Sequence, residues 1–262
     1  MRETNATILL ERKIKRLQKE TGNPNLTSKM DLKRSPREML VRAIIRPAKM
    51  LIFSPVVLLL SLYAALVYGL MYLLFATIPS VFGEQYGFNP GTAGLAYLGL
   101  GLGMMFALGI FAVLSDKLLG QKKGGTVARP ELRLILMKWF GPIIPIGCFI
   151  YGWTAYYHVH WIVPILGTLI IGFGNFLIVM PVQIYLVDAF GPQAAASAIA
   201  ANLVVRNLFG TFLALAAPPL YGRLGLGWGN SLLGFICLAF TPVPWLFYRY
   251  GEFLRTRFVV KL

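Results

Sequence analysis

The chain has 262 residues, of which 57% are hydrophobic and 13% are charged, and its formal net charge is +15. Soluble domains carry about 25% charged residues, so this composition excludes an ordinary soluble protein and indicates a membrane protein. Of the 25 Lys and Arg residues, 13 precede residue 51. That basic segment comes directly before the first long apolar run, which favours contact with an anionic membrane surface over binding to nucleic acid.

The basic segment contains two predicted helices. Leu10, Ile14 and Leu17 recur at helical spacing among basic residues, which predicts an amphipathic helix lying along the membrane surface. Further on, "SPRE" at 35–38 is a capping box with proline at the first helical position. We expect a short helix from Pro36 to Arg46 that stops at Pro47. Two roles stay open for this segment: a linker that docks between two membrane halves, or a solvated basic tail.

Six apolar runs are long enough to cross a bilayer, since a helical span needs about 20 residues. They are Leu51–Val81, Thr92–Leu114, Leu134–Tyr156, Trp161–Val187, Ala194–Tyr221 and Asn230–Tyr248. Basic residues alternate between the connections, with six in 115–138 and none in 82–91 or 157–160. The positive-inside rule therefore predicts that both termini are cytoplasmic. We expect an all-α membrane protein with a basic cytoplasmic segment at 1–50, a six-span bundle at 51–250 and a cytoplasmic tail at 251–262.

Arg206 lies in the middle of the fifth run, within "SAIAANLVVRNLFG". A charged side chain at the bilayer centre is costly, about 2.5 to 3.5 kcal/mol on insertion scales, so Arg206 should face the bundle interior or water. Asp188 is an improbable partner, because Arg206 lies about 16 Å deeper along its helix. On the preceding antiparallel helix the same depth falls near residue 177. Arg206, Asn175 and Gln183 are therefore predicted to form one polar level.

Further polar residues extend the predicted cavity. Asn202 precedes Arg206 by four residues and shares its helix face. In the first run, Ser61, Tyr68 and Tyr72 follow the spacing i, i+7, i+11 and form a polar stripe on an apolar helix. This stripe predicts a cavity lining, with aromatic packing as the alternative.

The remaining motifs give little support to enzyme chemistry. "GLGLG" at 99–103 lies inside an apolar run with no preceding strand, so we interpret Gly99 and Gly103 as a GxxxG helix-packing pair rather than a phosphate loop. Cys148 and Cys237 stand alone in separate runs and are expected to be packing residues. No spacing suggests a nucleophile with a base, or a metal site. We expect neither an enzyme nor a cofactor, and the outline that remains is that of a carrier.

Several stretches carry a resemblance to a known family. "MPVQIYLVDAF", "ASAIAANLVVRNLFGTF" and "LGLGWGNSLLGFICLAFTPVPWLFYRYGE" resemble the C-terminal half of fungal twelve-span drug:proton antiporters of the major facilitator superfamily. "RETNATILLERKIKRLQKETGN" is similar to the central cytoplasmic loop of that family. The resemblance implies that the six spans correspond to the seventh to twelfth of the family. It also implies that Arg206 and Asn202 belong to the central cavity or to the contact between halves.

The resemblance adds one more candidate element. Ser115, Asp116 and Lys117, in "VLSDKLLGQKK", are similar to a loop motif of the superfamily that acts as a conformational latch. The match is partial, because Ala112 stands where the motif has its first glycine. A solvated turn is the alternative for this segment.

The residues predict a membrane carrier, and the resemblance implies transmembrane transport by half of a proton-coupled exporter, which we expect in the plasma membrane. The resemblance implies a small amphiphilic or cationic substrate such as a drug or a polyamine, the proton gradient as driving force, and a missing N-terminal half or a second copy as partner. The expected cavity residues are Arg206, Asn202, Asn175, Gln183, Tyr68, Tyr72 and Ser61, with Arg206 steering charge and the tyrosines stacking on substrate. Two alternatives stay open: a truncated membrane protein without transport activity, and a homodimeric six-span carrier.

Overall fold

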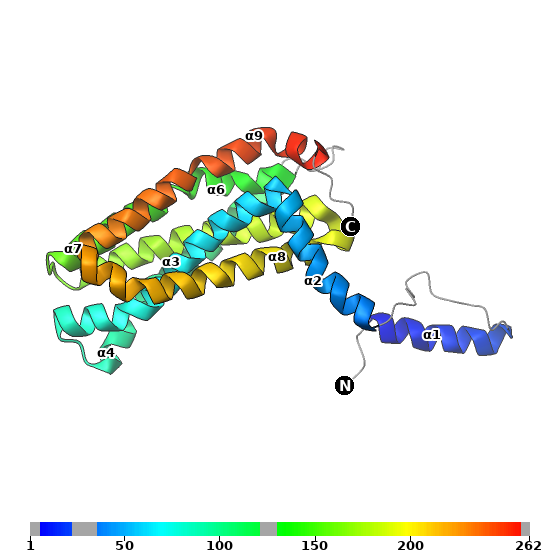
Figure 1. The fold of residues 1–262 in the computed structure, drawn as a ribbon, viewed down its shortest axis with the longest axis horizontal. Coiled ribbons are helices and arrows are strands. Elements are labelled where there is room, and N and C mark those ends of the chain that lie inside the picture. The colour runs from blue at the N-terminus through cyan, green and yellow to red at the C-terminus, as the bar shows by residue number, and fades with distance from the viewer. Residues whose placement is uncertain (1–5, 23–35, 121–129, 258–262) are drawn as a thin grey trace. The chain divides into compact units, whose positions relative to one another are not determined.

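The computed structural model describes residues 6–22, 36–120 and 130–257, and the regular elements in these ranges are helices (Figure 1). The chain divides into two compact units, Met1–Ile44 and Ile45–Leu262. The first unit contains α1 (Ala6–Thr21), in which Arg16 pairs with Glu20 at 2.7 Å. The predicted helix around Leu10, Ile14 and Leu17 is therefore confirmed.

Helix α2 (Pro36–Phe53) starts at the proline that the sequence predicts, but the expected stop at Pro47 is wrong. The helix continues through Pro47 to Phe53, although an internal proline removes one backbone hydrogen bond. Met50, on the added turn, is fully buried in the core of the second unit. Burial of that side chain offsets the local cost of the proline.

The second unit is a bundle arranged around α3 (Pro55–Tyr86). Ser54 caps the start of α3, because its Oγ accepts a hydrogen bond from the amide of Val57 at 3.4 Å. Gly87 ends the helix with a left-handed backbone, at φ 66°. The other helices are α4 (Pro90–Leu95), α5 (Tyr97–Gly120), α6 (Leu134–Phe140), α7 (Ile143–Tyr156), α8 (Ile162–Phe240) and α9 (Pro242–Arg257), with a 3-10 turn η1 at Pro130–Arg133.

Two glycines divide α8 into three segments. Gly191 and Gly225 have non-helical backbones with φ of 64° and 69°, a region that favours glycine. Asn175 and Arg206 lie on either side of Gly191, and both reach neighbouring residues of α3, so the chain reverses between them. Tyr221 donates a hydrogen bond to Asn230 at 3.1 Å, whereas nine residues of straight helix would separate them by about 14 Å. The three segments, 162–190, 192–224 and 226–240, therefore run back and forth.

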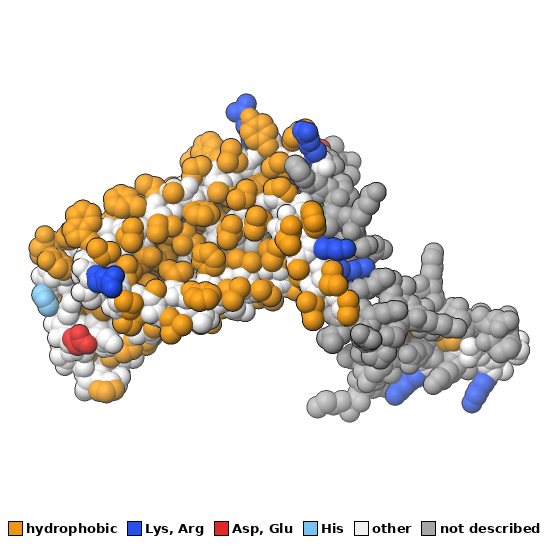
Figure 2. Space-filling view, viewed as in Figure 1, with side chains coloured by type: hydrophobic (Ala, Val, Ile, Leu, Met, Phe, Trp, Pro, Cys, Tyr) orange, Lys and Arg blue, Asp and Glu red, His pale blue; other side chains and the backbone are white. Residues whose placement is uncertain are grey.

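Within the described residues, five helical stretches are long and apolar enough to cross a membrane. They are Pro55–Tyr86, Pro90–Ser115, Pro130–Tyr156, Ile162–Gly191 and Ala194–Leu254. The first four correspond to the first four predicted runs. The fifth covers the last two predicted runs and contains the reversal at Gly225. Figure 2 shows hydrophobic side chains over the middle of the bundle and charged side chains toward its ends.

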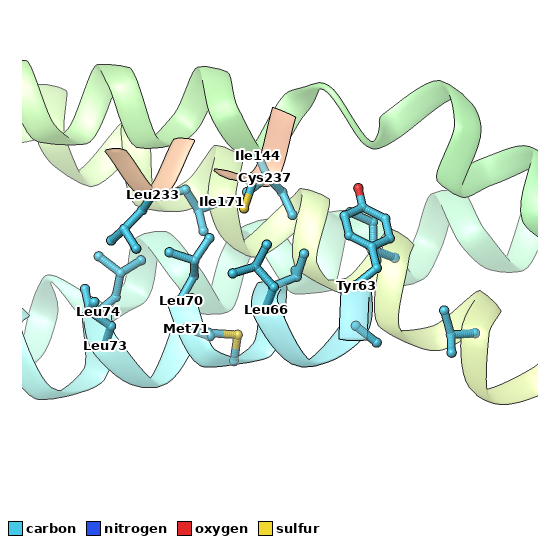
Figure 3. Close-up of a cluster of buried hydrophobic side chains, with 14 of the residues drawn as sticks. Tyr63, Leu66, Leu70, Met71, Leu73, Leu74, Ile144, Ile171, Leu233 and Cys237 are labelled. Atoms are coloured by element: carbon cyan, nitrogen blue, oxygen red, sulfur yellow. The ribbon is translucent and has the colours of Figure 1, made fainter. Parts of the chain in front are cut away.

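The core of the bundle lies between α3 and its neighbours. Figure 3 shows Leu66, Leu70 and Leu74 of α3 pointing toward side chains from α7 and from the first and third segments of α8. Cys148 and Cys237 are buried free thiols in this core, so their predicted packing role is confirmed. Helix α3 thus packs against α7 and against two segments of α8.

Glycine allows α5 to lie against the first segment of α8. A Cβ atom on Gly99 would lie 2.5 Å from Thr168 Oγ1, and one on Gly103 would meet the backbone at Leu169 and Phe173. From the other helix, a Cβ on Gly172 would lie 2.5 Å from the carbonyl oxygen of Leu100. The predicted GxxxG pair is therefore confirmed as a close-packing contact.

We predict that Gly103→Ala lowers the free energy of unfolding by about 1 to 3 kcal/mol, because the added methyl meets backbone that cannot rotate away. Gly101→Ala is the matched control, since a Cβ there has no atom within 4 Å. That control should be neutral or stabilising by up to about 1 kcal/mol through helix propensity. Thermal unfolding of both variants in detergent measures the difference, and equal midpoints would contradict this packing.

Candidate functional site

The second segment of α8 runs alongside α3 in the same direction. Ser61 meets Asn202, Tyr68 meets Arg206, and Tyr72 lies against Gly210. These contacts occur in the same order along both helices, so the helices are parallel. We call this line of contacts, formed by Ser61, Tyr68, Tyr72, Asn202, Arg206 and Gly210, the seam.

One end of the seam is a buried polar pair. Asn202 Nδ2 donates a hydrogen bond to Ser61 Oγ at 3.2 Å, and the two residues are only 1% and 0% exposed. The Asn202 Oδ1 atom is buried and has no hydrogen-bond partner among the described residues. Polar contacts of this kind hold membrane helices in register, since the alternative is an unsatisfied amide in hydrocarbon.

The middle of the seam holds a cation against two tyrosines. The guanidinium carbon of Arg206 lies 4.3 Å from the centroid of the Tyr68 ring, a cation–π distance. The Tyr68 hydroxyl donates to the Tyr72 hydroxyl at 3.1 Å, and the two ring centroids are 4.8 Å apart. Arg206 Nε is buried without an acceptor, and Arg206 forms no ion pair with any described residue. Tyr68 therefore covers one face of the Arg206 guanidinium, and the N–H donors of the guanidinium have no acceptor among the described residues.

The expected polar level of Arg206, Asn175 and Gln183 does not form. Asn175 is 3% exposed and donates to the backbone carbonyl of Val67 at 3.0 Å. Val67 and Tyr68 are consecutive, so Asn175 and Arg206 lie at the same depth, as the span lengths predict. The two residues nevertheless contact α3 separately, Asn175 at Val67 and Arg206 at Tyr68. Gln183 is half-buried and forms no hydrogen bond with the described residues. Asn175 thus ties the first segment of α8 to α3, because its amide donates to a carbonyl there, whereas the Arg206 guanidinium offers no acceptor.

Beyond Tyr72, a cavity of about 560 Å³ opens between α3, the end of α7 and the reversal at Gly225. It is lined by Ala76, Thr77, Ser80, Val81, Glu84, Gln85, Tyr156, His158, Pro218, Tyr221, Gly222, Gly225 and Leu226. None of the cavity residues expected from the sequence lines this cavity. Its signal was the polar spacing of Thr77, Ser80 and Glu84 on one face of α3, at i, i+3 and i+7.

At the opposite end of the bundle, Arg133 joins three elements. Its Nε donates to Asp188 Oδ2 at 3.1 Å and its Nη1 donates to Ser115 Oγ at 3.0 Å. Asp188 is therefore paired with Arg133, in agreement with the depth argument that separated it from Arg206. The expected loop at Ser115, Asp116 and Lys117 is instead the last part of α5, which continues to Gly120 because no glycine or proline occurs between Ser115 and that residue. The side chains of Asp116 and Lys117 lie outside the described ones.

Comparison with known proteins identifies the family. The sequence profile described as Major Facilitator Superfamily matches residues 7–215, most of the chain. The chain belongs to the major facilitator superfamily. No solved structure matches it. No group of three or more His, Cys, Asp or Glu in the described part of this facilitator chain could hold a metal ion.

Three curated relatives of this facilitator chain are fungal transporters. It is 68% identical to the MFS-type transporter MFS19 of Alternaria alternata, over all of this chain and 54% of that protein. It is 66% identical to the MFS transporter fsa7 of Fusarium sp., over all of this chain and 51% of that protein. It is 56% identical to a Gibberella fujikuroi protein named Trichosetin biosynthesis cluster MFS transporter, over all of this chain and 49% of that protein. The chain thus spans about half the length of these relatives.

We predict that Asn202 and Ser61 are energetically coupled in this facilitator bundle. A double-mutant cycle with Asn202→Ala and Ser61→Ala should give a coupling energy of about 0.6 kcal/mol and at most about 1.7 kcal/mol, the range of hydrogen bonds between membrane helices. Thermal unfolding of the four proteins in detergent measures it. The Asn175→Ala and Ser61→Ala pair serves as control, because Asn175 bonds to Val67 instead. Additive effects in both cycles would contradict the Asn202–Ser61 contact.

Proposed function

We propose that this chain works as one half of a proton-driven exporter of small amphiphilic molecules. Family membership supports membrane transport, and the chain matches about half of each transporter compared above. Facilitators alternate access by rocking two halves around a site near the bilayer midplane. The part of the relatives that this chain does not match is the natural complement, which favours a separate half over a second copy of this chain.

The observation that carries the proposal is the unmet charge in the seam. Arg206 is embedded in the segment at 192–224 and has a ring on one side and no ion-pair partner among the described residues. An intramembrane cation is costly, so it marks a substrate or ion pathway by default. A complementary half would enclose this side of the seam and form the second wall of a central cavity.

Proton coupling is assigned to the complementary half. The carboxylates of the described spans are Glu84, Glu131, Asp188 and Glu252, and each lies within a few residues of a span end. A proton carrier in an antiporter has to sit along the transport path, where a carboxylate can be reached from both sides in turn. We therefore place that carboxylate opposite the seam, outside this chain.

The positions of basic residues also support an orientation of the bundle in the membrane. Lys138 lies over the ring of Trp245 at 3.6 Å, at the same end as the Arg133–Asp188 pair, and the basic segment before residue 51 leads into this end of α3. The positive-inside rule then places this end, with both termini, in the cytoplasm. We assign the plasma membrane, since an exporter clears its substrate from the cell there. The relative named for a biosynthesis cluster supports a small product of metabolism as substrate.

Reconstitution of two halves tests this function. The chain is co-expressed with the part of the Alternaria alternata transporter that it does not match, and both are purified into vesicles with an imposed pH gradient. We expect flux of a fluorescent amphiphile only when both halves are present, and loss of that flux when a protonophore collapses the gradient. Flux by this chain alone would show a homodimeric carrier. Absence of flux in every combination would leave a membrane protein without transport activity and overturn the proposal.

Water access to the seam gives a second test in the same two-half assembly. A cysteine replacing Tyr72, which is 41% exposed, should react with a charged, membrane-impermeant thiol reagent. A cysteine replacing Met105 is the matched control, because this 69% exposed residue of α5 lies in an apolar span with exposed Leu102 and Phe106 and should face lipid. The buried Cys148 and Cys237 should stay silent. If the Met105 variant is labelled and the Tyr72 variant is not, water does not reach the seam.

A further inference from the structure

We propose that the seam recognises an anionic amphiphile, with Arg206 binding the negatively charged group and a row of aromatic rings holding the apolar body. This inference rests on the proposed transport function and narrows its substrate class. The resemblance to drug exporters implies amphiphilic or cationic substrates, whereas the charges along the seam favour an anion.

The Arg206 guanidinium has N–H donors that no described residue accepts. Tyr68 covers one face at 4.3 Å, and Arg206 has no hydrogen bond or ion pair with the described residues. A guanidinium carries five N–H donors in a planar fork that fits carboxylates and similar oxyanions in two-point contacts. In a low-dielectric setting such a contact is stronger than in water. An anionic ligand would therefore satisfy donors that the protein leaves unsatisfied.

The second observation is a continuous row of rings that begins at Arg206. Ring centroids are 4.8 Å apart from Tyr68 to Tyr72, 6.0 Å from Tyr72 to Phe75 and 5.8 Å from Phe75 to Tyr97. Tyr97 joins the row from α5 and is fixed there, because its hydroxyl donates to the Phe75 carbonyl at 2.7 Å. Tyr72 and Phe75 are 41% and 39% exposed. The rings thus offer an apolar path that leads away from the charge.

The third observation disfavours a cationic ligand. Arg206 already occupies a face of Tyr68 and would repel a second positive charge in the seam. On α3 the nearest described carboxylate along the helix is Glu84, 12 residues beyond Tyr72, or about 18 Å of helix. A cation at the rings would therefore meet a like charge and no counter-charge from α3. A neutral amphiphile would pack against the rings but would leave the Arg206 guanidinium without a counter-charge.

Matched probes separate these cases. Dansylaminoundecanoic acid and dansylaminoundecylamine share one fluorescent body and chain, and differ in carrying a carboxylate or an ammonium group. Binding of each to the full chain in nanodiscs of zwitterionic lipid is measured by fluorescence, with empty nanodiscs subtracted. We expect the acid to bind at least about tenfold more tightly than the amine, as charge-assisted hydrogen bonds imply.

Three variants separate the contribution of the charge from that of the aromatic rings. Arg206→Gln should weaken the acid about tenfold or more and should leave the amine unchanged or improved, so amine binding also shows that the variant is folded. Tyr72→Leu should weaken both probes by similar factors, because it removes part of the ring row and leaves the charge. Arg206→Lys keeps the charge without the planar fork and should weaken the acid less than Arg206→Gln does.

The outcomes separate this inference from the proposed function. Equal affinities, a preference for the amine, no saturable acid binding, or an Arg206→Gln variant that binds the acid normally would each overturn the inference. If the two-half assembly transports the amine and not the acid, the exporter proposal stands and the anionic substrate class is wrong. If the chain binds the acid through Arg206 but the assembly transports neither probe, the site stands and the transport function fails.

Discussion

The packing of α8 against α3 is the interaction on which the bundle depends. The first segment of α8 reaches α3 through Asn175, which binds the carbonyl of Val67, and the second segment reaches the next residue through Arg206 on Tyr68. One helix is thus held from two directions at a single depth. Because lipid tails provide no hydrophobic force between helices, such polar contacts and close van der Waals packing have to provide the specificity. The seam is therefore a structural joint as well as a candidate site.

Small residues make this arrangement possible elsewhere in the bundle. Gly99, Gly103 and Gly172 allow backbone contact between α5 and α8, and Gly167 lies where a Cβ would be 2.7 Å from the Tyr151 amide. The approach of the helices leaves little room for rearrangement inside the bundle. At the opposite end from the cavity, Arg133 ties Ser115 of α5 to Asp188 of α8. Polar ties and backbone contacts together make this bundle a compact body.

Much of the fold could be predicted from sequence, because hydrophobic length and Gly spacing are local signals. Four candidate spans match single apolar runs, the fifth stretch covers the last two runs, and the GxxxG pair packs as expected. The stop at Pro47 was wrong, since the burial of Met50 depends on tertiary contacts that a local rule does not include. In the site, helical spacing placed Tyr68 and Tyr72 on one stripe correctly. The acceptor of Asn175 could not be predicted, because the sequence does not show which backbone carbonyl a neighbouring helix presents.

The parallel packing of the second segment of α8 against α3 could not be predicted from local sequence patterns either. Asn175 and Gln183 were assigned to Arg206 because an antiparallel neighbour in the chain is the simplest partner. The structure instead pairs Arg206 with a helix 138 residues earlier. Similarly, Arg133 counted in the sequence only as a basic residue near a span end, and its two acceptors come from elements far away along the chain.

The reversals of α8 have a mechanical consequence. Each turn is made around a single left-handed glycine, so the three segments are tethered with almost no slack. No one of them can slide along the membrane normal without pulling the next. If the chain works as the transporter half proposed above, a path to either side of the membrane would open by tilting of the three segments together rather than by movement of one helix.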